Sequence, residues 1–236
     1  MEYELSIIIP VFNKLNFTKS ALEDLLKLGS NHQIIIIDNA STDGTEKYLR
    51  NMPSPKPGRA HFAYFRNSEN TGFARACNTA YMAAAGQNIM FLNNDIRVSK
   101  NHLTWTELII EACKRGELVS PTVGHLTNDL QFIKEDAELT GKNDYLSGWN
   151  LAASRKTFER LRMDNGDCPF STEFGLAFFE DTDLSFRAKR LSPPIEFYVP
   201  TDIPVKHFGH VTAKDLDIKS LYTNAREIFV KKWMKK

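Results

Sequence analysis

Polar residues follow three apolar segments in the N-terminal half of this chain. The first apolar segment is followed by Pro10-Val11-Phe12-Asn13, the second by Asp38 and the third by Asn93-Asn94-Asp95. In a parallel α/β sheet, ligands bind at the carboxyl ends of the strands. If the apolar segments are strands, their polar ends could bind a base, a ribose and a metal-bound phosphate. Asp38 alone is weaker evidence, because Asp-x-x-x-x-Asp-Gly after a strand is also common turn and helix-cap chemistry.

A second candidate centre is the acidic pair Glu180-Asp181, which opens a helical pattern of the form Glu-Asp-x-Asp-Leu-x-x-Arg. Acidic residues at a helix start also complement the helix dipole, so the pair has an ordinary structural explanation. The apolar residues from Phe174 to Phe179 favour a catalytic role. They would place the carboxylates beside a wall of low dielectric, where the pKa of a general base rises toward neutrality.

Seven blocks occur in an order that resembles the family 2 glycosyltransferases, whose catalytic domain has the GT-A fold. The blocks are Ile7 to Asn13, Ile36 to Thr45, Asn70 to Asn78, Phe91 to Asp95, Ser147-Gly148, Glu180 to Arg187 and His207-Phe208-Gly209. The resemblance implies an α/β fold with a Rossmann-like, mostly parallel central sheet flanked by helices, a smaller acceptor-side sheet and a C-terminal helix. It also implies an inverting enzyme that moves one sugar, hexosyl or deoxyhexosyl, from a nucleoside-diphosphate sugar to an acceptor hydroxyl.

The resemblance assigns two groups of binding residues. The donor nucleotide would be bound by Pro10, Phe12, Asn13, Asp38, Asn70, Gly72, Phe73, Arg75, Asn78, Asn93 and Asn94. Gly72 has a physical reason of its own, because a helix N-terminus approaches a diphosphate closely only where side chains are absent. The acceptor would be bound by Ser147, Gly148 and Trp149, whose indole can stack on a sugar ring.

The Asn93-Asn94-Asp95 block occupies the position of the family's DxD motif, with one carboxylate remaining. Asp95 would bind Mn²⁺ or Mg²⁺, because both ions prefer hard oxygen ligands and a diphosphate supplies more of them. A lone histidine after a strand is usually structural, but His207 matches the family's His-x-Gly block and is the candidate second metal ligand. Its imidazole would favour Mn²⁺, and His210 is the competing ligand.

The same resemblance makes Asp181 the general base, with Glu180 beside it contacting the acceptor and with Asp183 and Arg187 supporting the helix. Asp181 would take the proton of the acceptor hydroxyl during a single in-line displacement at the anomeric carbon. The chain lacks the Gln-x-x-Arg-Trp block of the processive members. One sugar per encounter is therefore expected.

The elements that must position these residues alternate between strands and helices, as expected for a parallel sheet covered on both faces. We expect strands at Leu5–Ile9, Gln33–Ile37, His61–Arg66 and Asn88–Leu92, and helices near Leu15–Leu28, Thr45–Asn51, Phe73–Ala85 and His102–Arg115. Asp43 is the expected N-cap of the second helix, with Glu46 completing a capping box.

The second half of the chain is less regular. We expect polar loops at Thr127–Asn143 and Arg162–Ser171, a helix from Glu180, short strands near Ile195–Val199 and Pro204–His207, and a last helix at about Lys214–Lys236. The chain is expected to be one domain, with residues 1–117 binding the nucleotide sugar and residues 118–236 the acceptor. The basic end, from Lys231 to Lys236, is expected to complement the dipole of a packed helix, and a peripheral membrane contact is the alternative.

Composition limits the setting and the partners. With 30 Lys and Arg against 29 Asp and Glu, the chain has no general attraction to polyanions. Three separated cysteines and no apolar run long enough for a membrane span predict a reducing, cytoplasmic location, with the inner membrane face as a variant. The expected acceptor is a glycan, a lipid-linked saccharide or another hydroxyl compound, and a homodimer stays open.

Three other functions predict different sequence features. A sugar-phosphate nucleotidyltransferase would carry a Gly-rich, Arg-containing loop after the first strand, where this chain has Pro10-Val11-Phe12-Asn13. A nicotinamide dehydrogenase would carry GxGxxG after a strand, and none occurs. The reduced Asn-Asn-Asp block favours a non-catalytic nucleotide-sugar or glycan-binding module, whereas Asp95, Asp181 and His207 together favour an enzyme.

Overall fold

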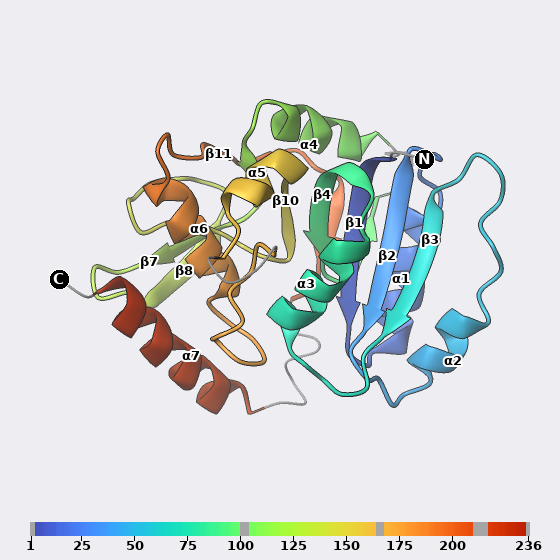
Figure 1. Cartoon of the computed structure of the whole chain (residues 1–236), viewed down its shortest axis with the longest axis horizontal. Coiled ribbons are helices and arrows are strands. Elements are labelled where there is room, and N and C mark those ends of the chain that lie inside the picture. The colour runs from blue at the N-terminus through green and yellow to red at the C-terminus, as the bar shows by residue number, and fades with distance from the viewer. Residues whose placement is uncertain (1–2, 100–103, 164–167, 210–216, 235–236) are drawn as a thin grey trace.

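A seven-stranded sheet in the order β11-β6-β10-β4-β1-β2-β3 forms the centre of the molecule (Figure 1). The computed structural model describes residues 3–99, 104–163, 168–209 and 217–234. Neighbouring strands among β1 to β4 run parallel, and β10 runs antiparallel to both β4 and β6. The expectation of a mostly parallel central sheet is confirmed. The strands are β1 (Tyr3–Val11), β2 (His32–Asp38), β3 (His61–Arg66), β4 (Gly86–Leu92), β6 (Leu118–Val119), β10 (Asn150–Ser154) and β11 (Phe197–Tyr198).

Helices cover both faces of this sheet, which explains why its strands read as continuous apolar runs. Side chains alternate between the two faces along a strand. Ile7 and Ile9 pack with α1 (Leu15–Leu25) and α4 (Trp105–Lys114), whereas Ile8 packs with α3 (Phe73–Ala83) and α5 (Arg155–Arg160). All three isoleucines are almost completely buried. The sheet is thus held rigidly between two apolar layers, and its strand ends can position polar groups.

The start of α2 (Thr45–Arg50) differs from the predicted capping box. The N-cap is Gly44 with φ of 93°, not Asp43. Asp43 Oδ1 accepts a hydrogen bond of 3.2 Å from the N–H of Thr45 in α2, and its Oδ2 accepts one of 2.9 Å from the N–H of Leu15, at the start of α1. Glu46 pairs with Arg66 and with Arg50. The carboxylates that were assigned to one helix end therefore tie different elements together.

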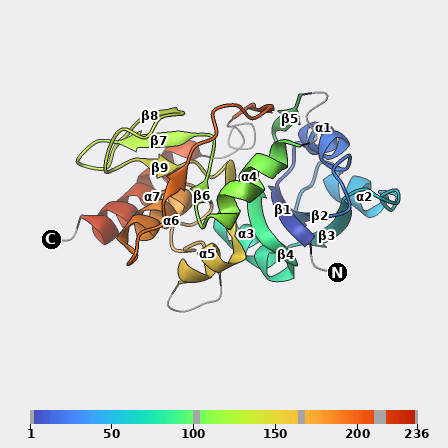
Figure 2. The same ribbon diagram turned by 90° about the horizontal axis from the view of Figure 1, so that it is seen from above.

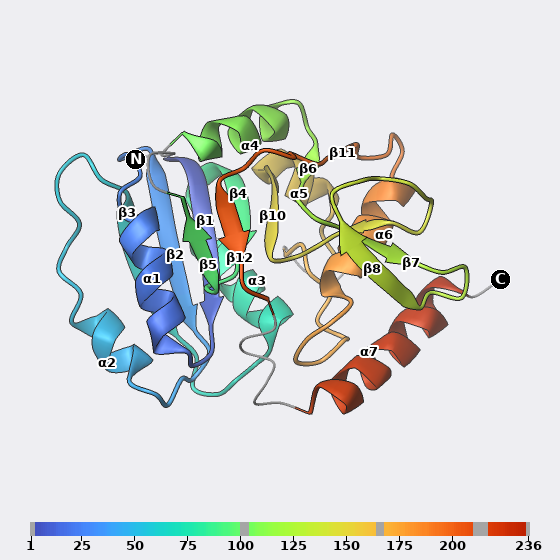
Figure 3. The ribbon, with the colours of Figure 1, turned by 180° about the vertical axis from the view of Figure 1, so that it is seen from behind.

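Two small sheets and helices α6 and α7 lie outside the central sheet and its flanking helices. Figure 2 shows the sheet β8-β7-β9 and helix α7 at the end of the molecule opposite α2, and Figure 3 shows β12 beside β5. The segment expected to be a polar loop at Thr127–Asn143 contains strand β8. The elements are β5 (Ile96–Val98), β7 (Val123–Leu126), β8 (Phe132–Asp136), β9 (Tyr145–Leu146), β12 (Val205–His207), α6 (Glu180–Arg190) and α7 (Ile218–Trp233).

Helix α7 packs on the domain through its apolar face and its basic end. Phe229 is fully buried against Phe179 and Phe186. Near the end of the helix, the Trp233 indole N–H donates a 3.0 Å hydrogen bond to Asp183, and Lys232 lies 2.8 Å from the same carboxylate. These contacts are those expected of a packed helix. Within the described ranges, no helix is long and apolar enough to cross a bilayer.

Candidate active site

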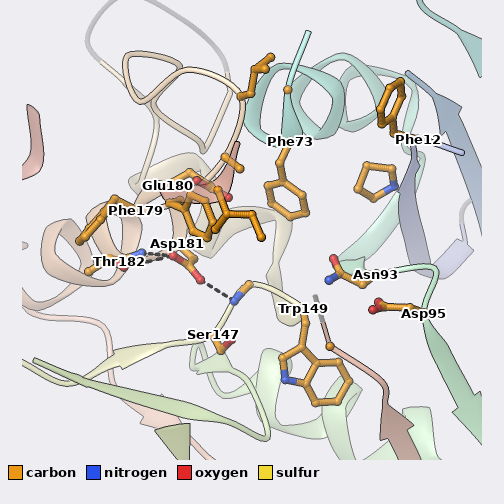
Figure 4. A pocket seen from close by; sticks show the side chains of 18 of the residues that line it. Phe12, Phe73, Asn93, Asp95, Ser147, Trp149, Phe179, Glu180, Asp181 and Thr182 are labelled. Atoms are coloured by element: carbon orange, nitrogen blue, oxygen red, sulfur yellow. Dashed lines mark hydrogen bonds between the residues drawn. The ribbon is translucent and has the colours of Figure 1, made fainter. Parts of the chain in front are cut away.

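A cavity of about 550 Å³ opens where β1 and β4 end and is lined from both halves of the chain. The acid pair lies on one side, and Phe12, Asn93 and Asp95 lie on the other (Figure 4). Most of the residues predicted from sequence line this one cavity. They are Pro10, Phe12, Asn70, Gly72, Phe73, Asn93, Asn94 and Asp95 from the first half, and Ser147, Gly148, Trp149, Glu180, Asp181 and His207 from the second.

Asp38 does not line the cavity, because its carboxylate is bound by other groups of the protein. The side chain is completely buried. Its Oδ2 pairs with the Arg66 guanidinium and accepts a 3.1 Å hydrogen bond from the Tyr64 hydroxyl, and its Oδ1 accepts one of 2.8 Å from the Ser41 N–H. Asn13 is also absent from the lining, and its Oδ1 accepts a 2.8 Å hydrogen bond from the Thr42 N–H. Both residues hold the loops that frame the strand ends.

Two predicted donor residues on α3 hold a neighbouring loop instead. The Asn78 side chain forms hydrogen bonds of 2.8 and 3.2 Å with the backbone C=O and N–H of Phe170. Arg75 donates to the Thr172 carbonyl at 3.4 Å. Neither side chain lines the cavity. The asparagine and arginine thus fix the segment that leads to the acid pair.

A contact within the protein requires a glycine at position 72. The residue has φ of 85°, and a Cβ atom placed there would lie 2.6 Å from Leu176 Cα. The next backbone N–H, of Phe73, donates a 2.9 Å hydrogen bond to the Leu176 carbonyl. Gly72 lines the cavity, and the contact with Leu176 is a second reason for a glycine here, beside the predicted approach of a diphosphate, which stays a prediction.

Sequence reasoning missed several residues of the lining. Asn39 is the centre of a network in which it donates a 2.8 Å hydrogen bond to Asn70 Oδ1 and accepts one of 3.0 Å from the Thr71 N–H. Its position directly after Asp38 was the available signal. The wall formed by Phe132, Glu135, Tyr145 and Tyr222 comes from β8, β9 and α7, and no local pattern marks it.

The acid pair is held at the cavity by an unusual turn. Phe178 and Phe179 have φ of 76° and 68°, which is rare for side chains of this size. Asp181 Oδ2 accepts a 2.8 Å hydrogen bond from the Gly148 N–H, and Oδ1 accepts one of 2.6 Å from the Thr182 N–H. A Cβ at position 148 would lie 3.1 Å from that Oδ2. The turn and the glycine together bring the carboxylate onto the backbone of the acceptor-side loop.

Burial raises the pKa of both acids, and in Glu180 the neighbouring Asp181 charge raises it further. The two hydrogen bonds from backbone N–H groups oppose this rise for Asp181, because they stabilise the ionised form. Asp181 therefore ionises first, and its charge keeps the proton on Glu180. The ionised Asp181 is suited to accepting a proton, and the protonated Glu180 beside it is suited to donating a hydrogen bond.

This arrangement predicts that Glu180→Gln stabilises the fold at high pH. Because the pKa of Glu180 is raised on folding, the folded chain holds the proton more tightly than the unfolded chain. Wild-type stability should then fall as the pH rises above about 4.3, by up to about 1.4 kcal/mol per pH unit, until the raised pKa is reached. The neutral glutamine removes this loss. Thermal melts should show equal midpoints at pH 4 and a higher midpoint for the variant at pH 8.

The matched control for this prediction is Glu69→Gln at an exposed position. It should leave the difference between pH 4 and pH 8 as in the wild type. A Glu180→Gln melting curve that shows the same pH dependence as the wild type would exclude a raised pKa at this site.

Asp95 and His207 face each other at the opposite side of the cavity. Asp95 Oδ1 lies 3.1 Å from His207 Nε2, and Asn93 Nδ2 lies 3.4 Å from the same nitrogen. Adjacent ligands of an octahedral ion with bonds of about 2.1 Å are about 3 Å apart, so this pair fits two neighbouring positions on Mg²⁺ or Mn²⁺. No group of three or more His, Cys, Asp or Glu side chains suited to a metal occurs in the described part of the chain. Ligand oxygens would have to complete the coordination.

Asn94 and Trp149, two of the remaining predicted site residues, have partners within the protein. Asn94 is buried and donates a 2.9 Å hydrogen bond to the Thr18 hydroxyl. One face of the Trp149 indole is covered by the His207 ring, so that face is closed to the acceptor sugar that was predicted to stack there. His210, the competing metal ligand, lies outside the described residues.

Curated proteins similar to this chain are glycosyltransferases. TuaG of Bacillus subtilis (strain 168), a proposed teichuronic acid biosynthesis glycosyltransferase, is 32% identical over 100 residues, which are 42% of this chain and 38% of that protein. An uncharacterized glycosyltransferase of Rickettsia felis is 36% identical over 93 residues, which are 39% of this chain and 15% of that protein. The chain thus spans well under half the length of these relatives.

Solved structures with a GT-A fold share the architecture. A Pyrobaculum calidifontis mannosyltransferase in complex with GDP-Man and Mn²⁺ aligns with a TM-score of 0.61 and 18% identity, over 86% of this chain and 56% of that one. S. aureus TarS with UDP-GlcNAc aligns with a TM-score of 0.60 and 18% identity, over 87% of this chain and 57% of that one. The model of the family described as Glycosyl transferase family 2 matches residues 6–181. The chain therefore belongs to glycosyl transferase family 2.

Proposed function

We propose that this domain transfers a single sugar from a nucleoside-diphosphate sugar to an acceptor hydroxyl, with inversion at the anomeric carbon and with a divalent cation bound at the diphosphate. The observation that carries the proposal is the placement of Glu180 and Asp181 on the opposite side of one cavity from Asp95, which lies 3.1 Å from His207. A donor held between the two sides would present its anomeric carbon to an acceptor bound beside Asp181.

Asp181 is the base in this proposal. The Gly148 and Thr182 N–H groups hold its carboxylate in a fixed orientation, so a proton can be taken from the acceptor hydroxyl as the oxygen attacks. Glu180 stays protonated and donates a hydrogen bond to a second acceptor oxygen. The apolar residues of the turn before the pair exclude water, which would otherwise compete with the acceptor.

Asp95 and His207 would hold Mn²⁺ or Mg²⁺, which would neutralise the charge of the departing diphosphate. The S. aureus and Pyrobaculum structures contain a uridine and a guanosine nucleotide sugar, respectively. Of the possible donors, we favour a uridine or thymidine diphosphate sugar, with its base bound near Pro10 and Phe12. The similarity to TuaG favours a glycan acceptor in polysaccharide biosynthesis.

Calorimetric titration of UDP, TDP and GDP, each with Mn²⁺ and with EDTA, tests the donor side. We expect at least one nucleotide to bind and the binding to weaken on chelation. A screen of the matching sugar nucleotides against glycan acceptors, with the anomeric configuration of the product read by NMR, then tests the transfer and the inversion. Binding of a nucleotide without transfer to any acceptor would favour the non-catalytic module, and equal binding in EDTA would exclude the metal.

A further inference from the structure

Trp149 contacts His207 and the loop that carries Asp95. Its indole ring stacks on the His207 imidazole with ring centroids 4.7 Å apart and planes 7° from parallel. Its backbone carbonyl accepts a 2.8 Å hydrogen bond from the N–H of Asn93, the first residue of the Asn93-Asn94-Asp95 block. One residue thus links the histidine from β12 to the loop that carries the carboxylate.

The indole itself is fixed from a third direction. Its Nε1–H donates a 2.9 Å hydrogen bond to the Thr122 hydroxyl, and only 8% of the residue is exposed. Trp149 directly precedes β10, where Asn150 pairs with Leu92 of β4. The ring therefore cannot turn without losing its hydrogen bond to Thr122 and its packing in the core, and it presents a fixed flat surface to His207.

The imidazole needs such a surface. Histidines that bind metals usually donate their second ring N–H to a carboxylate or a carbonyl, which fixes the ring plane. Within the described ranges, the hydrogen-bond partners of His207 lie at Nε2, the nitrogen directed at Asp95 and Asn93. The side chain is 22% exposed, and among the described residues stacking on Trp149 restrains the plane of the ring in addition to the contacts at Nε2.

We propose that Trp149 is a positioning residue, which orients His207 and anchors the Asn93-Asn94-Asp95 loop so that the site can bind a divalent cation. The proposal rests on the proposed function, because that function includes the cation. It replaces the expected role of Trp149 as a stacking surface for the acceptor sugar.

The test measures Mn²⁺ binding by electron paramagnetic resonance, in the presence of saturating UDP and, separately, GDP. We expect Trp149→Leu to weaken Mn²⁺ binding by about 10- to 100-fold, the usual cost of removing a group that orients a metal-binding histidine. Trp149→Phe keeps an aromatic face and should lose less than about 5-fold. Nucleotide binding in EDTA should be unchanged in both variants, and thermal melts verify that each is folded.

Fluorescence provides a second readout that needs no destabilising substitution. Paramagnetic Mn²⁺ next to His207 should quench Trp149 emission in the wild type, whereas Mg²⁺ should not. Trp149→Phe, which retains Trp105 and Trp233, should lose most of this quenching.

The outcomes separate the two hypotheses. If the wild type binds no Mn²⁺ with either nucleotide, the metal-dependent function fails and this proposal fails with it. If the wild type binds Mn²⁺ but Trp149→Leu binds it equally well, only the positioning role is overturned. Unchanged Mn²⁺ affinity together with a raised KM for the acceptor would return Trp149 to the acceptor site.

Discussion

Asp181→Asn should reduce sugar transfer by about 10²- to 10⁴-fold, the usual contribution of a general base, and leave nucleotide binding intact. Asparagine has nearly the same shape, and its side-chain oxygen can still accept the hydrogen bond from Gly148 or from Thr182. It cannot accept the acceptor proton at neutral pH. Initial rates with the active donor, together with nucleotide affinity by calorimetry, measure the two effects separately.

The control is Asp202→Asn, an exposed acid that is not among the residues of the cavity, which should keep the wild-type rate. Burial raises the pKa of Asp181. As the pH is lowered, the wild-type rate should therefore begin to fall at a higher pH than it would with an ordinary aspartate as the base. An Asp181→Asn enzyme that keeps most of its activity would transfer the role of base to Glu180.

Asp95→Ala should abolish the part of nucleotide binding that depends on metal, a loss of about 10²-fold or more. Asp95 is the one carboxylate of its block, and its side chain is 6% exposed and directed at His207. Without it, His207 alone would present one nitrogen to a cation that prefers oxygen ligands. Calorimetry of the best-binding nucleotide, with Mn²⁺ and with EDTA, measures the difference.

In EDTA the Asp95→Ala variant and the wild type should bind nucleotide equally, because the proposed base contacts near Pro10 and Phe12 do not involve Asp95. Asp202→Ala, at the exposed position, serves as the matched control and should keep the metal-dependent gain. Retention of that gain in Asp95→Ala would mean that the cation is held elsewhere.

The central sheet was predictable because buried parallel strands are continuous apolar runs. Ile34 to Ile37, for example, are fully buried in β2. Asp95, Asp181 and Gly148 were found because each lies in a sequence block that resembles the family. Contacts between distant segments were not predictable. No residue near Asp38 in the sequence indicates that its carboxylate pairs with Arg66. Likewise, no residue near Gly72 indicates that the backbone of Leu176 packs against it.

The wall formed by β8 and α7 has a consequence for how enzymes of this kind can diversify. Phe132 and Tyr222 line the cavity, whereas the proposed base and metal ligands are carried by α6, the loop after β4 and β12. If the proposed function holds, this wall and the reacting groups come from separate segments of the chain. Exchanging the segment from Thr127 to Asn143, or the cavity face of α7, offers a route to new acceptors with the reaction machinery left in place.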